Sequence, residues 1–187
     1  MIQIRIHGRG GQGVVAMAEI LAIAFFNNGQ NAQAFPHFGV ERSGAPIQSF
    51  VRVSQQEIFS REHVYEPDIL IILDDSLLGK ADLFSGIKAH TKVIINSKEA
   101  AKDLLNKFKK ISKIPSGFSE KNIFVKDATS LALEIFANNM VNTAMLGFLC
   151  QVPGLIKKEA AISAVKEKFA NKSADIIEKN ILIINRI

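Results

Sequence analysis

The chain has 187 residues, of which 48% are hydrophobic, so it can bury a sizeable core and is not a disordered chain. Its net charge of +5 comes from scattered lysines without interleaved aromatic residues, which argues against a nucleic-acid-binding protein. Its single cysteine, Cys150, excludes an intrachain disulfide and a four-thiolate iron–sulfur cluster.

The predicted elements alternate between strands and helices along most of the chain. Short apolar runs predict strands, and apolar residues at helical spacing predict helices. In chain order we expect strand 2–6, helix 14–28, strands 31–35, 47–53, 69–73 and 92–96, helix 98–110, strand 123–125, and helices 131–139, 141–151, 157–169 and 174–184. This order predicts one domain over residues 1–187: an α/β fold, a three-layer α/β/α sandwich with a mixed, mostly parallel sheet. The polar alternation of 47–53 favours an antiparallel position for that strand.

A long uncharged segment lies between Glu134 and Lys157. Its asparagines, with Pro153 and Gly154, make a membrane span a poor interpretation, so we expect a buried helix. Residues 142–147 could instead lie against another subunit. The chain opens on an alternating strand rather than a basic-then-apolar leader, so the expected location is cytoplasmic, with no membrane partner.

The segment His7–Gly13 joins the first strand to the first helix and has the sequence His-Gly-Arg-Gly-Gly-Gln-Gly. The G-x-G-x-x-G spacing can hold a dinucleotide phosphate at a helix N-terminus. That fingerprint also requires an acidic residue about 20 positions later, and after Glu19 the next carboxylate is Glu41. The alternative is a tight turn whose glycines serve packing or a subunit contact.

A second unusual segment, Phe35–Pro46, combines aromatic, turn and charged residues just before a strand. Loops of this composition often form binding surfaces. The alternative is an ordered connection in which Glu41 and Arg42 are merely solvated neighbours.

Together these two segments resemble the gamma subunit, or gamma domain, of the 2-oxoacid:ferredoxin or flavodoxin oxidoreductases, the pyruvate branch in particular. Later segments are also similar to that family: Pro67-Asp68, Asp127-Ala128-Thr129, residues 142–147, residues 161–169, and Glu178-Lys179-Asn180. The chain departs from the usual pattern at His37, where a small residue is common, and at Val40 and Ser43.

The resemblance implies a subunit of an enzyme that converts pyruvate and coenzyme A to acetyl-CoA and CO2 and passes electrons to ferredoxin or flavodoxin. It implies alpha, beta and ferredoxin-like delta subunits as partners. Thiamine diphosphate, Mg and [4Fe-4S] clusters are expected in those partners, because this chain has one cysteine and no Gly-Asp-Gly segment. Coenzyme A is the expected co-substrate. Alternatives are a gamma subunit for another 2-oxoacid (2-oxoglutarate, branched-chain or aryl pyruvate), a stand-alone nucleotide-binding module, and an assembly protein without ligand contacts.

The candidate site residues come from both segments and would shape either the coenzyme A surroundings or the subunit interface. Within this set, Arg9 and Arg42 would contact anions and Gln12 would position neighbours by hydrogen bonding. The set comprises Gly8, Arg9, Gly10, Gly11, Gln12, Gly13, Glu41 and Arg42.

The remaining polar candidates have more ordinary interpretations. The four histidines, at positions 7, 37, 63 and 90, have no paired spacing, so we expect loop or surface histidines and no metal site, although His7 could donate a hydrogen bond to a phosphate. Asp74 and Asp75 follow a strand end, where carboxylates can meet ligands, but capping of a helix near Ser76 is the expected role.

Overall fold

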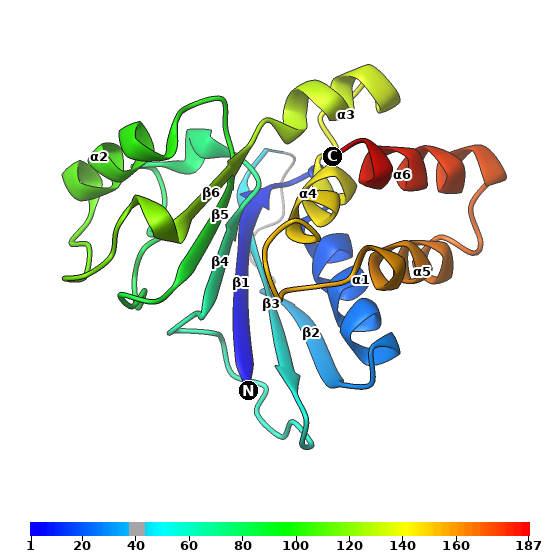
Figure 1. Cartoon of the computed structure of the whole chain (residues 1–187), viewed down its shortest axis with the longest axis horizontal. Coiled ribbons are helices and arrows are strands. Elements are labelled where there is room, and N and C mark those ends of the chain that lie inside the picture. Colours follow the sequence, from blue (N-terminus) through cyan, green and yellow to red (C-terminus); the bar gives the residue numbers. More distant parts are fainter. Residues whose placement is uncertain (38–43) are drawn as a thin grey trace.

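The computed structural model describes residues 1–37 and 44–187. Within these ranges six strands form one sheet in the order β2-β3-β1-β4-β5-β6 (Figure 1). The strands are β1 (Ile2–Arg9), β2 (Asn31–His37), β3 (Pro46–Ser54), β4 (Ile69–Ile72), β5 (Lys92–Asn96) and β6 (Ile123–Lys126).

The sheet is mixed. β1, β4, β5 and β6 run parallel, whereas β3 pairs antiparallel with both β1 and β2. The predicted mostly parallel sheet and the antiparallel β3 are therefore confirmed. The carboxyl ends of the four parallel strands meet at one edge, where ligand sites of open α/β sheets occur.

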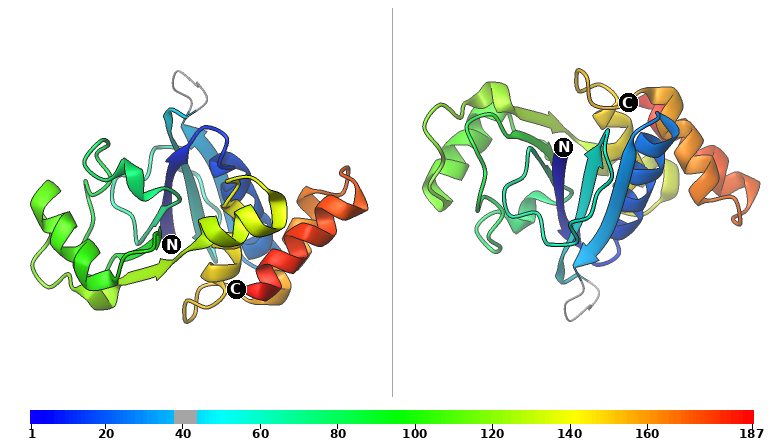
Figure 2. Two further views of the ribbon diagram at one scale, coloured as in Figure 1. Left: turned by 90° about the horizontal axis from the view of Figure 1, so that it is seen from above. Right: turned by 90° about the horizontal axis from the view of Figure 1, so that it is seen from below.

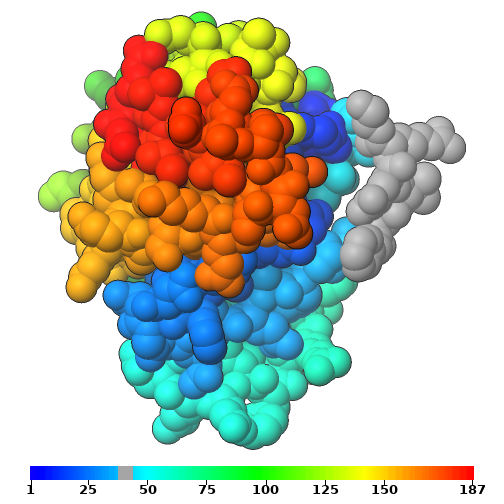
Figure 3. Space-filling view, turned by 90° about the vertical axis from the view of Figure 1, so that its right-hand side faces the viewer, coloured from blue at the N-terminus to red at the C-terminus, as the bar shows by residue number. Residues whose placement is uncertain are grey.

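Five helices cover one face of the sheet. They are α1 (Val14–Asn27), α3 (Ala128–Phe136), α4 (Asn142–Leu149), α5 (Lys158–Lys168) and α6 (Ala174–Arg186). The apolar residues of α1 and α4 pack with Ile4, Ile6 and Val51 of the sheet into one core. α5 and α6 lie outside α1 and α4 (Figures 2 and 3). Every residue of α4 is buried, which confirms the buried helix predicted for the uncharged segment.

The other face carries a second apolar core. Leu70 and Ile72 of β4 pack there with Leu104 and Phe108 of α2 (Ala101–Ile111). The short helices η1 (Asp75–Leu77) and η2 (Glu120–Asn122) belong to the connections on this side. Two cores on opposite faces of one sheet give the predicted three-layer sandwich.

Several predicted boundaries differ from the structure, and three of them have a visible cause. β1 continues to Arg9 because β3 pairs with it as far as Arg9 opposite Pro46. The helix predicted at 131–139 begins at Ala128, because Asp127 is its N-cap and accepts the backbone N–H of Ser130. Asn96 Oδ1 also accepts the backbone N–H groups of Ala128 and Thr129. α2 begins at Ala101 rather than at residue 98, because Ala100 is extended. Among the described residues, none of the helices has the length and apolar character that crossing a bilayer would require.

Candidate functional site

The turn after β1 is joined to the segment that precedes β3. Gly10 donates its backbone N–H to the carbonyl of Ala45 at 2.9 Å, and Gly44 donates to the carbonyl of Gly10 at 3.2 Å. These bonds continue the ladder between β1 and β3 beyond Arg9. Two segments separated by more than thirty residues in the sequence therefore form one surface.

Arg9 adds a third segment to this surface. Its Nη1 donates to the Gly44 carbonyl at 2.9 Å, and its Nη2 donates to Ser76 Oγ at 2.8 Å. Its Nε lies 3.3 Å from Asp74 Oδ2, and the side chain is 25% exposed. Arg9 thus ties the segment before β3 to the end of β4 and places a partly exposed positive charge between them.

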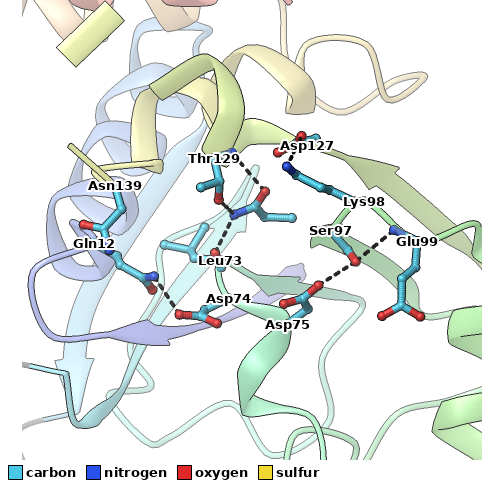
Figure 4. Close-up of a pocket in the computed structure, with 11 residues that line it drawn as sticks. Gln12, Leu73, Asp74, Asp75, Ser97, Lys98, Glu99, Asp127, Thr129 and Asn139 are labelled. Carbon is cyan, nitrogen blue, oxygen red and sulfur yellow. Dashed lines mark hydrogen bonds and ion pairs between the residues drawn. The ribbon is translucent and has the colours of Figure 1, made fainter. Parts of the chain in front are cut away.

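Gln12 is buried beside Arg9 and bridges the same groups. Its Oε1 accepts the backbone N–H of Arg9 at 2.8 Å, and its Nε2 donates to Asp74 Oδ2 at 2.8 Å (Figure 4). Both polar atoms of the side chain are used, so Gln12 holds the turn against Asp74. We name this arrangement of Arg9, Gln12, Asp74 and Ser76 the Arg9 network.

Asp74 is the acceptor on which the Arg9 network converges. Its Oδ1 accepts the Ser76 backbone N–H at 2.9 Å, so Asp74 caps η1, as predicted. Burial alone raises the pKa of this carboxyl, but hydrogen bonds from Ser76 and Gln12 and the positive charge of Arg9 outweigh burial. The pKa of Asp74 is therefore below its ordinary value, and the carboxylate stays charged at neutral pH.

Close packing explains why two positions of the turn, Gly8 and Gly13, are occupied by glycine. A Cβ on Gly8 would lie 2.6 Å from Cγ2 of Val14, and a Cβ on Gly13 would lie 2.5 Å from Nδ2 of Asn142. Gly13 also has a φ of 79°, a left-handed conformation that favours glycine. Close packing against α1 and α4 accounts for Gly8 and Gly13 without a nucleotide.

A hollow of about 400 Å³ lies beside the turn at the carboxyl ends of β4, β5 and β6. Figure 4 shows four carboxylates around it, while Lys98 supplies the cationic side chain among its lining residues. Those carboxylates are Asp74, Asp75, Glu99 and Asp127. This charge balance disfavours an anion in the hollow, so a phosphate would be better placed on the Arg9 side of the turn.

One of the four histidines, His7, departs from its predicted surroundings. His7 is buried at 2% exposure, and its Nε2 has no hydrogen-bond partner in the part of the chain that the structure describes. Burial, with a smaller contribution from the charge of Arg5, lowers the pKa of His7 to about 3. The expectation of a loop or surface position for His7 was wrong, because β1 extends through this residue. His37 and His63, which have no motif spacing, lie with Nδ1 and Nε2 3.0 Å apart.

The structure brings six of the eight predicted site residues into one turn, residues 8–13. Glu41 and Arg42 lie outside the described residues. Sequence reasoning missed Ser76 and Asn142 as partners of the turn and assigned Asp74 only a capping role. The adjacent Asp74 and Asp75 at a strand end were the available signal. In residues 1–37 and 44–187, no group of three or more His, Cys, Asp or Glu side chains is arranged to hold a metal ion.

The fold and the site define a mixed α/β protein with a glycine turn at the carboxyl edge of its sheet. Within that class, the chain belongs to the pyruvate ferredoxin/flavodoxin oxidoreductase family, whose model matches residues 3–187. The predicted family is confirmed, and the chain is a gamma subunit of the 2-oxoacid oxidoreductase type.

Two relatives illustrate the similarity in sequence. The pyruvate/ketoisovalerate oxidoreductases common subunit gamma of Pyrococcus furiosus is 42% identical over 180 residues, which cover 96% of this chain and 91% of the relative. Pyruvate synthase subunit PorC of Methanothermobacter marburgensis is 43% identical over 177 residues, which cover 94% of this chain and 90% of the relative.

Solved structures agree in fold. The pyruvate oxidoreductase subunit PORC of Thermotoga maritima matches with a TM-score of 0.77 at 32% identity, covering 99% of this chain and 93% of that one. The 2-oxoglutarate:ferredoxin oxidoreductase of Magnetococcus marinus, solved with 2-oxoglutarate, coenzyme A and succinyl-CoA bound, matches with a TM-score of 0.73 at 17% identity. This match covers 99% of this chain and 30% of that one, and at this identity it shows the fold alone.

Proposed function

We propose that the chain is the gamma subunit of an enzyme that oxidatively decarboxylates pyruvate. One pyruvate and one coenzyme A give acetyl-CoA, CO2 and one proton, and two electrons pass singly to ferredoxin or flavodoxin. The family membership and the printed names of the relatives in Pyrococcus furiosus and Methanothermobacter marburgensis support pyruvate as the substrate.

A branched-chain 2-oxoacid is the second candidate substrate. The name of the Pyrococcus furiosus relative describes a gamma subunit common to pyruvate and ketoisovalerate oxidoreductases. A gamma subunit shared in this way would leave substrate choice to other chains. The proposed role of this chain would then be the same with either substrate.

The Arg9 network is the observation that carries the proposed role of this chain. Three segments meet at Arg9, whose guanidinium is held by Gly44, Ser76 and Asp74 and remains partly exposed. A rigid surface with one fixed cation suits contact with catalytic chains and with an anionic co-substrate. A fold neighbour solved with coenzyme A bound is consistent with coenzyme A as that co-substrate.

The partners belong to the same proposal. We assign thiamine diphosphate, magnesium and [4Fe-4S] clusters to alpha, beta and delta subunits. One cysteine, Cys150, cannot supply four thiolates to a cluster, and the chain has no Gly-Asp-Gly segment for thiamine diphosphate and magnesium. We also propose that residues 1–187 act as one gamma-type domain and that the complex works in the cytoplasm.

Affinity purification of this chain from its native cell under anaerobic conditions tests the proposal. The eluate is assayed for viologen reduction that requires both pyruvate and coenzyme A, with ketoisovalerate, 2-oxoglutarate and an aryl pyruvate as parallel substrates. Activity with co-eluting thiamine-binding and cluster-binding chains is the expected result. An intact chain recovered without partners or activity would contradict the proposal and favour a stand-alone nucleotide-binding module.

A further inference from the structure

Two imidazoles meet on the face of the sheet opposite α1. His37 is the last residue of β2, and His63 belongs to the connection between β3 and β4. His37 Nδ1 and His63 Nε2 are 3.0 Å apart, and both side chains are exposed. The rings are perpendicular, with centroids 4.4 Å apart.

Contacts with β3 position both histidines. The His63 ring stacks on Phe50 of β3 with a centroid distance of 5.0 Å and an interplanar angle of 25°. Arg52 Nη2 donates to the main-chain carbonyl of His63 at 3.2 Å. The backbone of His37 is fixed by strand pairing opposite Gln48. Strand pairing and the stack on Phe50 therefore place the two residues next to each other, and their rings meet directly.

The separation of the two nitrogens matches adjacent ligands of one metal ion. Imidazole nitrogens lie about 2.0–2.1 Å from zinc, so two ligands at roughly a right angle are about 3 Å apart. Neutral imidazole suits Cu2+, Ni2+ and Zn2+. In the absence of a metal, the N–H of one ring can donate to the nitrogen of the other, so that the two imidazoles share one proton.

We propose that His37 and His63 form a two-imidazole chelate for one late first-row divalent ion, Cu2+, Ni2+ or Zn2+. Water completes the coordination shell, because both nitrogens lie at the surface. The affinity order follows the general preference of nitrogen sites, with Cu2+ bound most tightly. This inference is independent of the proposed enzymatic role, since it concerns side chains outside the Arg9 network.

The test is metal titration of the full chain prepared without a histidine tag. Ni2+ and Cu2+ binding is measured by calorimetry, and the Cu2+ complex is examined by electron paramagnetic resonance. We expect one site per chain and nitrogen hyperfine splitting from two imidazoles. His37→Ala removes one ligand from an exposed strand end. His63→Phe removes the other ligand and retains an aromatic ring over Phe50. Each variant should weaken binding at least tenfold.

His90→Ala is the matched control, because His90 is also an exposed histidine but does not belong to the pair. Its Nε2 lies 3.8 Å from Oδ1 of Asp68. It should bind the ion as the wild type does. Thermal unfolding without metal verifies that each variant is folded. The inference is overturned if the wild type binds no more tightly than His37→Ala and His63→Phe, which would leave a shared proton as the role of the pair. Loss of binding in His90→Ala alone would also overturn it.

Discussion

Asn142 lies so close to Gly13 that no β-carbon fits between them: a Cβ on Gly13 would be 2.5 Å from Nδ2 and 2.7 Å from Cγ of Asn142. Asn142 is the first residue of α4, and Gly13 is the residue from which α1 begins. The glycine turn is therefore shaped partly by a helix that lies more than 120 residues away in the sequence. Packing against Asn142 therefore explains Gly13, which a motif search would interpret as part of a nucleotide-binding site.

Replacing Gly13 by alanine should lower the free energy of unfolding more than replacing Gly11. Both glycines have positive φ, 79° and 95°, so alanine at either position is strained by about 1–2 kcal/mol. A Cβ on Gly11 meets nothing within 4 Å, whereas one on Gly13 meets Asn142. Overpacking should therefore cost Gly13→Ala a further ~1–3 kcal/mol. Urea denaturation of both variants measures the difference.

The double variant Gly13→Ala with Asn142→Ala separates strain from packing. The double variant should recover part of the additional loss in the free energy of unfolding. The short contact with Asn142 is removed, whereas the strain of the positive φ at residue 13 remains. Equal unfolding free energies for Gly11→Ala and Gly13→Ala would show that Asn142 moves away without cost.

Gln12→Ala should destabilise the chain by about 1–3 kcal/mol, because it leaves the Arg9 backbone N–H and Asp74 Oδ2 without their buried partner. The measurement is the midpoint of thermal or urea unfolding. Gln56→Ala is the matched control, since Gln56 is exposed and its substitution should have little effect. Similar midpoints for the two variants would argue that the Arg9 network does not depend on Gln12.

His7 should make the stability depend on pH between about 3 and 6.5. Its pKa is about 3 in the folded chain and near the ordinary 6.5 when unfolded, so the unfolded state binds more protons in this window. The free energy of unfolding should therefore rise with pH through the window, by at most a few kcal/mol from this residue. His7→Gln should flatten that rise when urea unfolding is compared at pH 4.5 and pH 7.5. An unchanged slope would mean that His7 gains a proton in the native state.

The elements were predictable because their signals are local. Alternation at Ile2, Ile4 and Ile6 marked β1, and the stripe of Ala101, Leu104, Leu105 and Phe108 marked α2. The earlier start of α3 had a local signal in Asp127, which caps the helix by accepting the Ser130 N–H. The second acceptor, Asn96, comes from a different strand, and no local pattern contains that contact.

The contacts of the candidate site were only partly predictable for the same reason. Residues 8–13 stood out because they are consecutive, but Ser76 and Asn142 join them through tertiary packing. His37 and His63 are brought together across β3, and their spacing in the sequence gave no sign of it. Long-range pairing is set by sheet register, which one sequence specifies only indirectly.

We propose that the Arg9 network shapes the coenzyme A surroundings of the assembled enzyme. The most direct measurement is steady-state kinetics of the reconstituted complex carrying Arg9→Ala, with Arg186→Ala, which alters the remote contact with Glu134, as the matched control. For Arg9→Ala we expect a several-fold higher apparent KM for coenzyme A, with the subunits still assembled and the KM for pyruvate unchanged. An assembled Arg9→Ala complex with an unaltered KM for coenzyme A would contradict it, and failure of assembly alone would make the turn an interface element.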